Sequence, residues 1–139
     1  MVVYYEPWVP QTPDEWKRYN CMGKEPVEYT MSKENSYFLV IENAIQGALC
    51  FDSFESVLED YTIGRTYNIY RYPDKVYSMD EEVQFTIKIP EDIYAPDRKY
   101  KMICVTKDGI PIIYDDLDED SKTITVKTNR FYAYALIYR

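Results

Sequence analysis

Apolar and polar residues alternate along much of the last third of this chain, from residue 83 to residue 139. In the stretch that Pro90 ends, every second residue is apolar: Val83, Phe85, Ile87 and Ile89. A period of two sends successive side chains to opposite faces of a strand, so one face is buried and the other solvated. Residues 122–128 repeat the pattern, with Ile124 and Val126 inward and with Thr123, Thr125 and Lys127 outward. This region therefore predicts an antiparallel β-meander.

A hairpin lies within the same region. Residues 100–107 and 110–114 are strand-like runs joined by Asp108 and Gly109, a dipeptide typical of a two-residue type I′ turn. Pro111 has no backbone N–H to donate to a neighbouring strand. We therefore expect its strand at a sheet edge, or its nitrogen on the side that makes no ladder hydrogen bond.

The chain closes on residues 131–139, which are apolar on both faces. Such a strand is typical of the centre of a sheet or of a position between two layers. Strand character is also present in residues 66–72, 27–31 and 37–41, and we expect the last two to form a hairpin. Residues 37–41 show no alternation, which suits a strand covered on both faces or an early core strand.

One short helix is predicted near the N-terminus. Thr12 has the form of an N-cap, Pro13 suits the first helical position, and Glu15 is placed to complete a capping box. Gly23 is a natural stop. The helix should therefore make about two turns and end near Cys21.

A second short helix is expected over residues 53–60, where apolar residues have helical spacing, although a strand is an open alternative. Residues 1–11 are broken by prolines and predict an extended lead-in or linker. At 139 residues the chain has the length of one ordinary domain, which we place at residues 12–139.

Charge and composition exclude several kinds of partner. With 24 acidic and 16 basic residues the formal charge is −8, so the surface repels nucleic-acid backbones and anionic lipids. No apolar run approaches the ~20 residues that span a bilayer, and no signal peptide or anchor is evident in the chain. We expect neither nucleic-acid binding nor membrane insertion within this chain.

The sequence contains no histidine. This excludes Ser-His-Asp and Cys-His catalysis and histidine-bound zinc, and neither a P-loop nor a GxGxxG motif is present. The chain is therefore predicted not to be an enzyme and to need no cofactor. A small carboxylate-based hydrolase is a third and much weaker hypothesis, because no pair of carboxylates is marked for acid–base work.

Three cysteines, Cys21, Cys50 and Cys104, cannot all pair within one chain, and none has metal-ligand spacing. Cys50 and Cys104 lie in apolar strand-like runs, which favours small buried side chains over reactive thiols. A disulfide between Cys50 and Cys104 is left open at this point.

A resemblance to a known module rests on four segments of the last third. Residues 83–90 read VQFTIKIP, residues 100–109 read YKMICVTKDG, residues 123–126 read TITV, and residues 131–138 read FYAYALIY. Their order resembles the C-terminal modules of cell-surface and secreted proteins of Gram-positive bacteria. In these modules a strand ending in proline precedes a DG hairpin, and the domain ends on a strand of the type F-S-x-Y-A-L. Tyr132 departs from the pattern, where serine is commoner.

The resemblance implies an Ig-like antiparallel β-sandwich that acts as a non-catalytic accessory or adhesion-type module. It implies a location outside the cell or at the cell surface, with a protein or a glycan there as partner. It covers residues 83–139 only and brings no catalytic residues.

An acidic loop is a candidate calcium site. Asp116, Asp118 and Asp120 are spaced two apart, as in loops where alternate oxygens point at one hard cation. An EF-hand would have glycine at the position of Ser121 and glutamate at that of Lys127. The simpler alternative is a solvated acidic hairpin loop.

Aromatic residues are the other candidate binding groups, with 16 tyrosines and 2 tryptophans in the chain. Exposed rings stack on the apolar faces of sugars and are also common in protein interfaces. This supports an alternative function, a carbohydrate-binding module, with the candidate ligand-binding residues Trp8, Trp16, Tyr70 and Tyr72. The simpler interpretation is that most of these rings form the core of a β protein.

Overall fold

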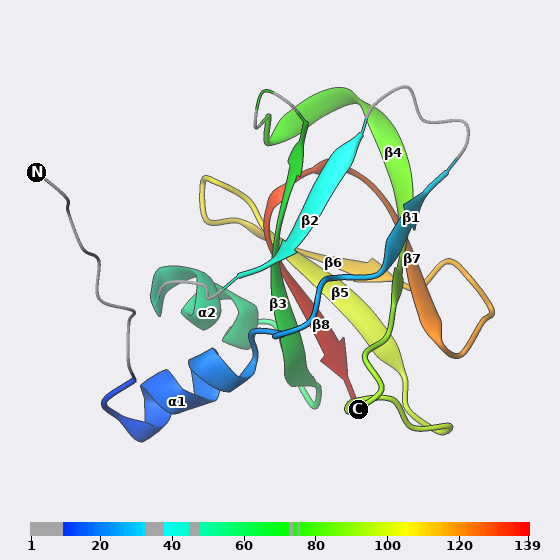
Figure 1. Ribbon diagram of the computed structural model, residues 1–139. Helices are drawn as coiled ribbons and strands as arrows, with labels where there is room; N and C mark the ends of the chain where they lie inside the picture. The colour runs from blue at the N-terminus through cyan, green and yellow to red at the C-terminus, as the bar shows by residue number, and fades with distance from the viewer. Residues whose placement is uncertain (1–9, 33–37, 45–47, 73, 75) are drawn as a thin grey trace, which may run out of the picture.

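The computed structural model describes residues 10–32, 38–44, 48–72, 74 and 76–139, and within them the chain is mainly β (Figure 1). The predicted lead-in, residues 1–11, therefore falls almost wholly outside the described residues. The elements, in chain order, are α1 (Pro13–Asn20), β1 (Tyr29–Met31), β2 (Leu39–Asn43), α2 (Ala48–Glu55), β3 (Thr62–Arg71), β4 (Ser78–Lys88), β5 (Tyr100–Val105), β6 (Pro111–Asp115), β7 (Thr123–Arg130) and β8 (Tyr132–Tyr138).

The strands form two antiparallel sheets. One has three strands in the order β1-β4-β7, and the other has five in the order β2-β3-β8-β5-β6. The predicted β-sandwich with two short helices is thus confirmed. Figure 1 shows the two helices beside the five-stranded sheet, at the bottom left of the view.

Two apolar clusters lie on the two faces of the five-stranded sheet. The inner cluster joins both sheets and includes Tyr67, Phe85, Ile87, Ile124 and Leu136. The outer cluster lies under the helices and includes Phe51, Phe54, Ile103, Ala135 and Ile137. Alternate residues of β8 enter each cluster, which explains why this strand is apolar on both faces.

The predicted positions of the last strands are confirmed. β8 is the central strand of its sheet, between β3 and β5. β6 is an edge strand, where the missing N–H of Pro111 costs no ladder hydrogen bond. The alternation of β4 is confirmed too, because Val83, Phe85 and Ile87 are buried.

The hairpin between β5 and β6 is correct, but its predicted type I′ turn is wrong. Thr106 N–H donates to the Ile110 carbonyl at 3.0 Å, and Gly109 N–H donates to the Thr106 carbonyl at 2.8 Å. The loop therefore has three residues, and its positive φ falls on Gly109, at 84°. A type I turn followed by a left-handed glycine needs one positive φ and spares Asp108 that conformation.

The predicted hairpin of residues 27–31 with 37–41 is wrong. β1 pairs with β4, with Tyr29 opposite Ile87, whereas β2 pairs with β3 in the other sheet. β2 is an edge strand and its burial alternates, since Leu39 and Ile41 are buried but Val40 is half-buried. It is therefore not covered on both faces.

The first helix is confirmed and the bounds of the second are corrected. In α1 the Thr12 side chain accepts from Glu15 N–H at 3.1 Å, and Cys21 is the C-cap. The Glu15 carboxylate accepts from Gln11 N–H at 2.7 Å, one residue before the N–H that the predicted capping box requires. The second segment is a helix, not a strand, but α2 ends at Glu55 instead of spanning residues 53–60. The aromatic residues of α2 pack onto the five-stranded sheet. After the helix, the positive φ of Glu59 changes the direction of the chain before β3 begins.

Thr125 is buried, although the alternation of residues 122–128 predicts it outward. The acidic loop folds over β7, and Thr125 Oγ1 donates to Asp118 at 2.6 Å. A nearby loop can bury the polar face of a strand, and the period-two pattern does not contain that information. β7 runs through Arg130, and the chain bends into β8 at Phe131.

All three cysteines are free, so the open question of a bridge between Cys50 and Cys104 is answered. Cys21 and Cys104 are buried and Cys50 is half-buried. Burial raises the pKa of the Cys104 thiol to about 12. This agrees with the prediction of a small buried side chain for Cys104, whereas Cys50 is half-buried and lies in a helix, α2, and not in a strand-like run.

Candidate functional site

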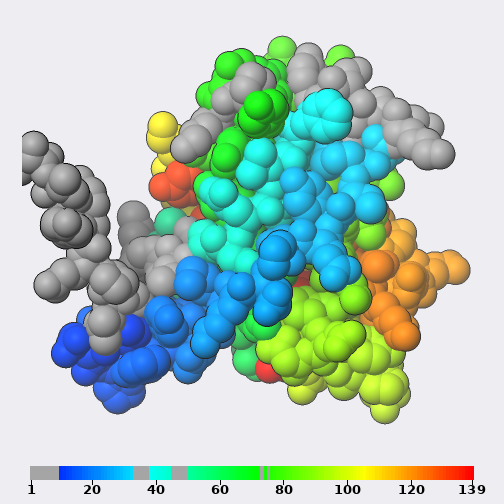
Figure 2. All heavy atoms as spheres, viewed as in Figure 1, coloured from blue at the N-terminus to red at the C-terminus, as the bar shows by residue number. Residues whose placement is uncertain are grey.

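A cavity of about 710 Å³ lies where the strap of residues 22–28 crosses the sandwich. Its other walls come from Asn43 of β2, from Arg65 and Tyr67 of β3, and from the chain around Pro90 after β4. Figure 2 shows the strap in blue, running across the front of the molecule above the yellow-green loop that follows β4. The volume lies within the range of about 300–1,000 Å³ that is usual for small-molecule sites.

Backbone hydrogen bonds hold the strap at both ends. Thr66 N–H of β3 donates to the Cys21 carbonyl at 3.0 Å, and Lys88 N–H of β4 donates to the Glu28 carbonyl at 2.9 Å. Between these points Asn43 Nδ2 donates to the Glu25 carbonyl at 2.6 Å. The strap therefore connects both sheets and is held against them by these bonds.

A β-bulge directs Arg65 toward the cavity. The pairing of β3 with β8 shifts register between Ile63 and Arg65. Ile63 belongs to the outer cluster, whereas Tyr67 belongs to the inner one. In a regular strand residues 63, 65 and 67 would share a face, so the shift is what places Arg65 on the same side as Tyr67. Gly64 fits here because a Cβ would lie 2.8 Å from Ile93 Cδ1.

Arg65 and Asp92 form the closest ion pair of the site. Arg65 Nη2 donates to both carboxylate oxygens of Asp92, at 2.7 and 2.6 Å, and Nη1 donates to the Gly64 carbonyl at 2.9 Å. The Arg65 side chain is only 15% exposed, whereas that of Asp92 is 62% exposed. The guanidinium is therefore held in place while the carboxylate faces solvent.

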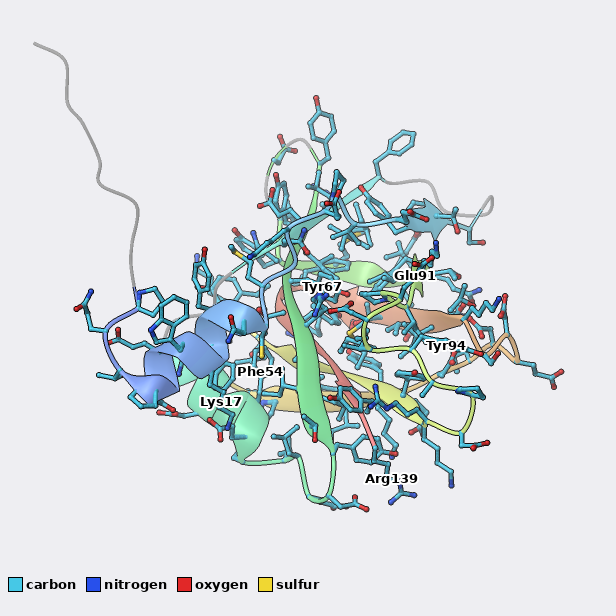
Figure 3. All side chains as sticks on the ribbon, turned by 60° about the horizontal axis from the view of Figure 1, so that its bottom comes forward. Lys17, Phe54, Tyr67, Glu91, Tyr94 and Arg139 are labelled. Atoms are coloured by element: carbon cyan, nitrogen blue, oxygen red, sulfur yellow. The ribbon has the colours of Figure 1, made fainter. Side chains whose placement is uncertain are left out.

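Tyr67 contributes to the inner side of the cavity. It is almost fully buried, and burial raises its pKa, so the phenol stays protonated over the whole physiological range. Figure 3 labels Tyr67 on β3 and Glu91 in the loop after β4, two of the residues that line the cavity. The cavity thus combines an aromatic residue and charged groups.

The predicted aromatic set is not brought together. Trp8 lies outside the described residues. Trp16 is in α1, where its ring meets that of Tyr19 edge-on with centroids 5.6 Å apart. Tyr70 is half-buried near the end of β3, and Tyr72 follows it, exposed. Figure 1 places α1 at the bottom of the view and the end of β3 at the top, so these rings do not form one surface.

The carboxylates of the acidic loop accept hydrogen bonds from backbone N–H groups of the same chain. Asp116 Oδ1 accepts from the N–H groups of Asp118 and Thr125, both at 3.0 Å, and Asp120 Oδ1 accepts from Lys122 N–H at 2.9 Å. Burial raises the pKa of Asp116. Within the part of the chain that the structure describes, no three acidic or cysteine side chains are placed to hold a metal ion. For Asp116, Asp118 and Asp120, calcium binding and a solvated acidic loop stay alternative predictions.

The residues that form the cavity were missed by sequence reasoning. Arg65 and Asp92 are 27 residues apart and belong to no motif. The one local signal is Gly64, since a glycine inside a strand often marks a bulge. The polar side chains around a non-local cavity cannot be recognised by spacing alone.

No helix among the described residues is long and apolar enough to cross a membrane. Comparisons of the chain with protein-family models, with curated proteins and with solved structures found no match. The resemblance of residues 83–139 to bacterial surface modules therefore stays a prediction.

Proposed function

We propose that this chain is a non-catalytic binding module, of the accessory or adhesion type, of a bacterial surface or secreted protein. The observation that carries the binding role is the cavity beside Arg65 and Asp92. A rigid sandwich that offers one concave site with a few fixed polar groups is suited to holding a ligand. The location at a cell surface is supported by the resemblance of residues 83–139 alone.

The chemistry of the cavity supports binding over catalysis. The sequence has no histidine, and Arg65 and Asp92 are engaged with each other. General acid–base work needs a group whose pKa is near the working pH and which is free to move a proton. A carboxylate that accepts two hydrogen bonds from an arginine is held in place and suits hydrogen bonding to a ligand instead.

A ligand screen by nuclear magnetic resonance tests the binding role. The uniformly ¹⁵N-labelled chain is mixed with a panel of sugars, amino acids and nucleosides, and we expect at least one compound to shift the amide signals of Met22, Val27 and Tyr67. Gly23→Val is the matched variant, because a Cβ at this position would lie 2.5 Å from Asn43 Oδ1 and would displace that side chain. It should abolish the shifts. If no compound shifts these signals, the proposed binding site is wrong.

The surface location is tested separately by the reading frame that encodes the chain. We expect an export signal together with an anchor or a neighbouring domain. A reading frame confined to these 139 residues would contradict the surface role and would leave the cavity unaffected.

A further inference from the structure

The charged groups around the cavity largely neutralise one another. Arg65 pairs with Asp92, and Lys88 Nζ lies 3.6 Å from Glu28 Oε2. The other charged residues of the lining are Lys24, Glu25 and Glu91. Three basic and four acidic groups leave a balance of one negative charge, against −8 for the whole chain. A cation that is already paired attracts a second anion only weakly, so the cavity favours an uncharged ligand.

The Arg65–Asp92 pair offers a donor and an acceptor side by side. A guanidinium has five N–H groups, and a carboxylate has about four lone-pair positions. The contacts of Arg65 with Asp92 and Gly64 use part of this capacity, and Asp92 is largely exposed. Two hydroxyl groups on adjacent carbons match this arrangement, because one donates to the carboxylate while the other accepts from the guanidinium. Such charge-assisted bonds are roughly twice as strong as neutral ones.

Apolar groups complete the lining. Met22, Val27 and Pro90 line the cavity together with Tyr67. Tyr67 belongs to the inner core, and Val27 packs against that core, so this part of the wall is fixed by packing. A sugar ring has the matching character, with hydroxyl groups at its rim and C–H groups on its faces, which can pack on the apolar side chains of Met22, Val27 and Pro90.

From these features we infer that the cavity binds a neutral saccharide, whose adjacent hydroxyl groups bridge Arg65 and Asp92. The inference rests on the proposed function and narrows it to one class of ligand. The sequence suggests carbohydrate binding at exposed aromatic residues. The structure favours a different location, the polar site between the strap and the sheets.

Calorimetric titration with neutral hexasaccharides tests the inference. The probes are cellohexaose, xylohexaose and mannohexaose, and at least one should bind the unmodified chain. Asp92→Asn keeps the size of the side chain but removes its charge, and it should weaken binding by about tenfold or more. Asp60→Asn is the matched control, because Asp60 also pairs with an arginine, Arg139, at 2.8 Å, is 63% exposed, and lies outside the cavity. It should leave the affinity unchanged.

The outcomes separate this inference from the proposed function. If none of the hexasaccharides binds, or if Asp92→Asn and Asp60→Asn bind alike, the saccharide inference is wrong. If amino acids or nucleosides still shift the amide signals of the cavity, the binding module stands with another class of ligand. Thermal unfolding of both variants shows that each is folded under the conditions of the titration.

Discussion

The Arg65 guanidinium donates to both carboxylate oxygens of Asp92, at 2.7 and 2.6 Å, although 27 residues separate the two. The contact ties β3 of the five-stranded sheet to the loop that follows β4 of the three-stranded sheet. It therefore lies where the two sheets and the strap of residues 22–28 meet. Because it lies at this junction, the pair can contribute both to the free energy of unfolding and to ligand binding.

The pair should matter little for stability. Asp92→Ala should lower the free energy of unfolding by only about 0.5–1 kcal/mol, because ion pairs with an exposed partner are screened by solvent. Urea denaturation followed by circular dichroism measures this change, with Asp60→Ala as a control of equal exposure. A loss above about 3 kcal/mol would show that the pair is a structural element of the sandwich, not a binding group.

A tyrosine hydroxyl should stabilise the bend between the two sheets. Tyr134 Oη donates to the Arg130 carbonyl at 2.5 Å and lies 3.3 Å from Thr128 Oγ1, next to the bend at Phe131. Tyr134→Phe should cost about 1–2 kcal/mol, because it removes buried hydrogen bonds. Tyr72→Phe, at an exposed position, should change stability by less than about 0.5 kcal/mol. Equal losses in the two variants would contradict a role for the buried hydroxyl.

The alternation of apolar residues was sufficient to predict much of this fold. The last strand could be placed at the centre of a sheet because both of its faces are apolar, and they enter the inner and outer clusters. Pro111 limited its strand to an edge or its nitrogen to the side without ladder hydrogen bonds, and Thr12 located the start of a helix, because each acts through its own backbone or its nearest neighbours.

Pairing between distant strands could not be predicted in the same way. β1 and β2 are close in sequence but lie in different sheets, because each finds a partner much later in the chain. The cavity has the same origin. Arg65 reaches it only through the register shift at Gly64, and Asp92 only through the packing of two sheets.

Thiol reactivity should follow burial and pH. Cys104 has its pKa raised to about 12 by burial, above the 9.0 of an exposed thiol. In the folded chain iodoacetamide should therefore modify the half-buried Cys50 before Cys104, as mass spectrometry can show. Fast alkylation of Cys104 at pH 8 would contradict its burial.

The same shift makes stability depend on pH. The Cys104 thiol loses its proton near pH 9 in the unfolded chain but only near pH 12 in the folded one. The free energy of unfolding should therefore fall as the pH rises between these values.

Calcium should have little effect on the folded chain. The carboxylates of Asp116 and Asp118 already accept hydrogen bonds from their own loop and from Thr125. Thermal unfolding in millimolar calcium and in chelator should therefore give coincident curves. Because a ligand that binds only the folded state raises the midpoint, an increase of several degrees with calcium would contradict this and support a metal site.

The location of the ligand decides between the cavity and the exposed aromatic residues. Phe38, just before β2, and Tyr72, just after β3, are exposed and joined by a hydrogen bond from Tyr72 N–H to the Phe38 carbonyl at 3.0 Å, and neither lines the cavity. The measurement is a chemical-shift map of the ¹⁵N-labelled chain during titration with a hexasaccharide that binds. We predict that the largest changes fall on Met22, Val27, Arg65 and Asp92. Changes centred on Phe38 and Tyr72 instead would contradict the assignment of the cavity as the binding site.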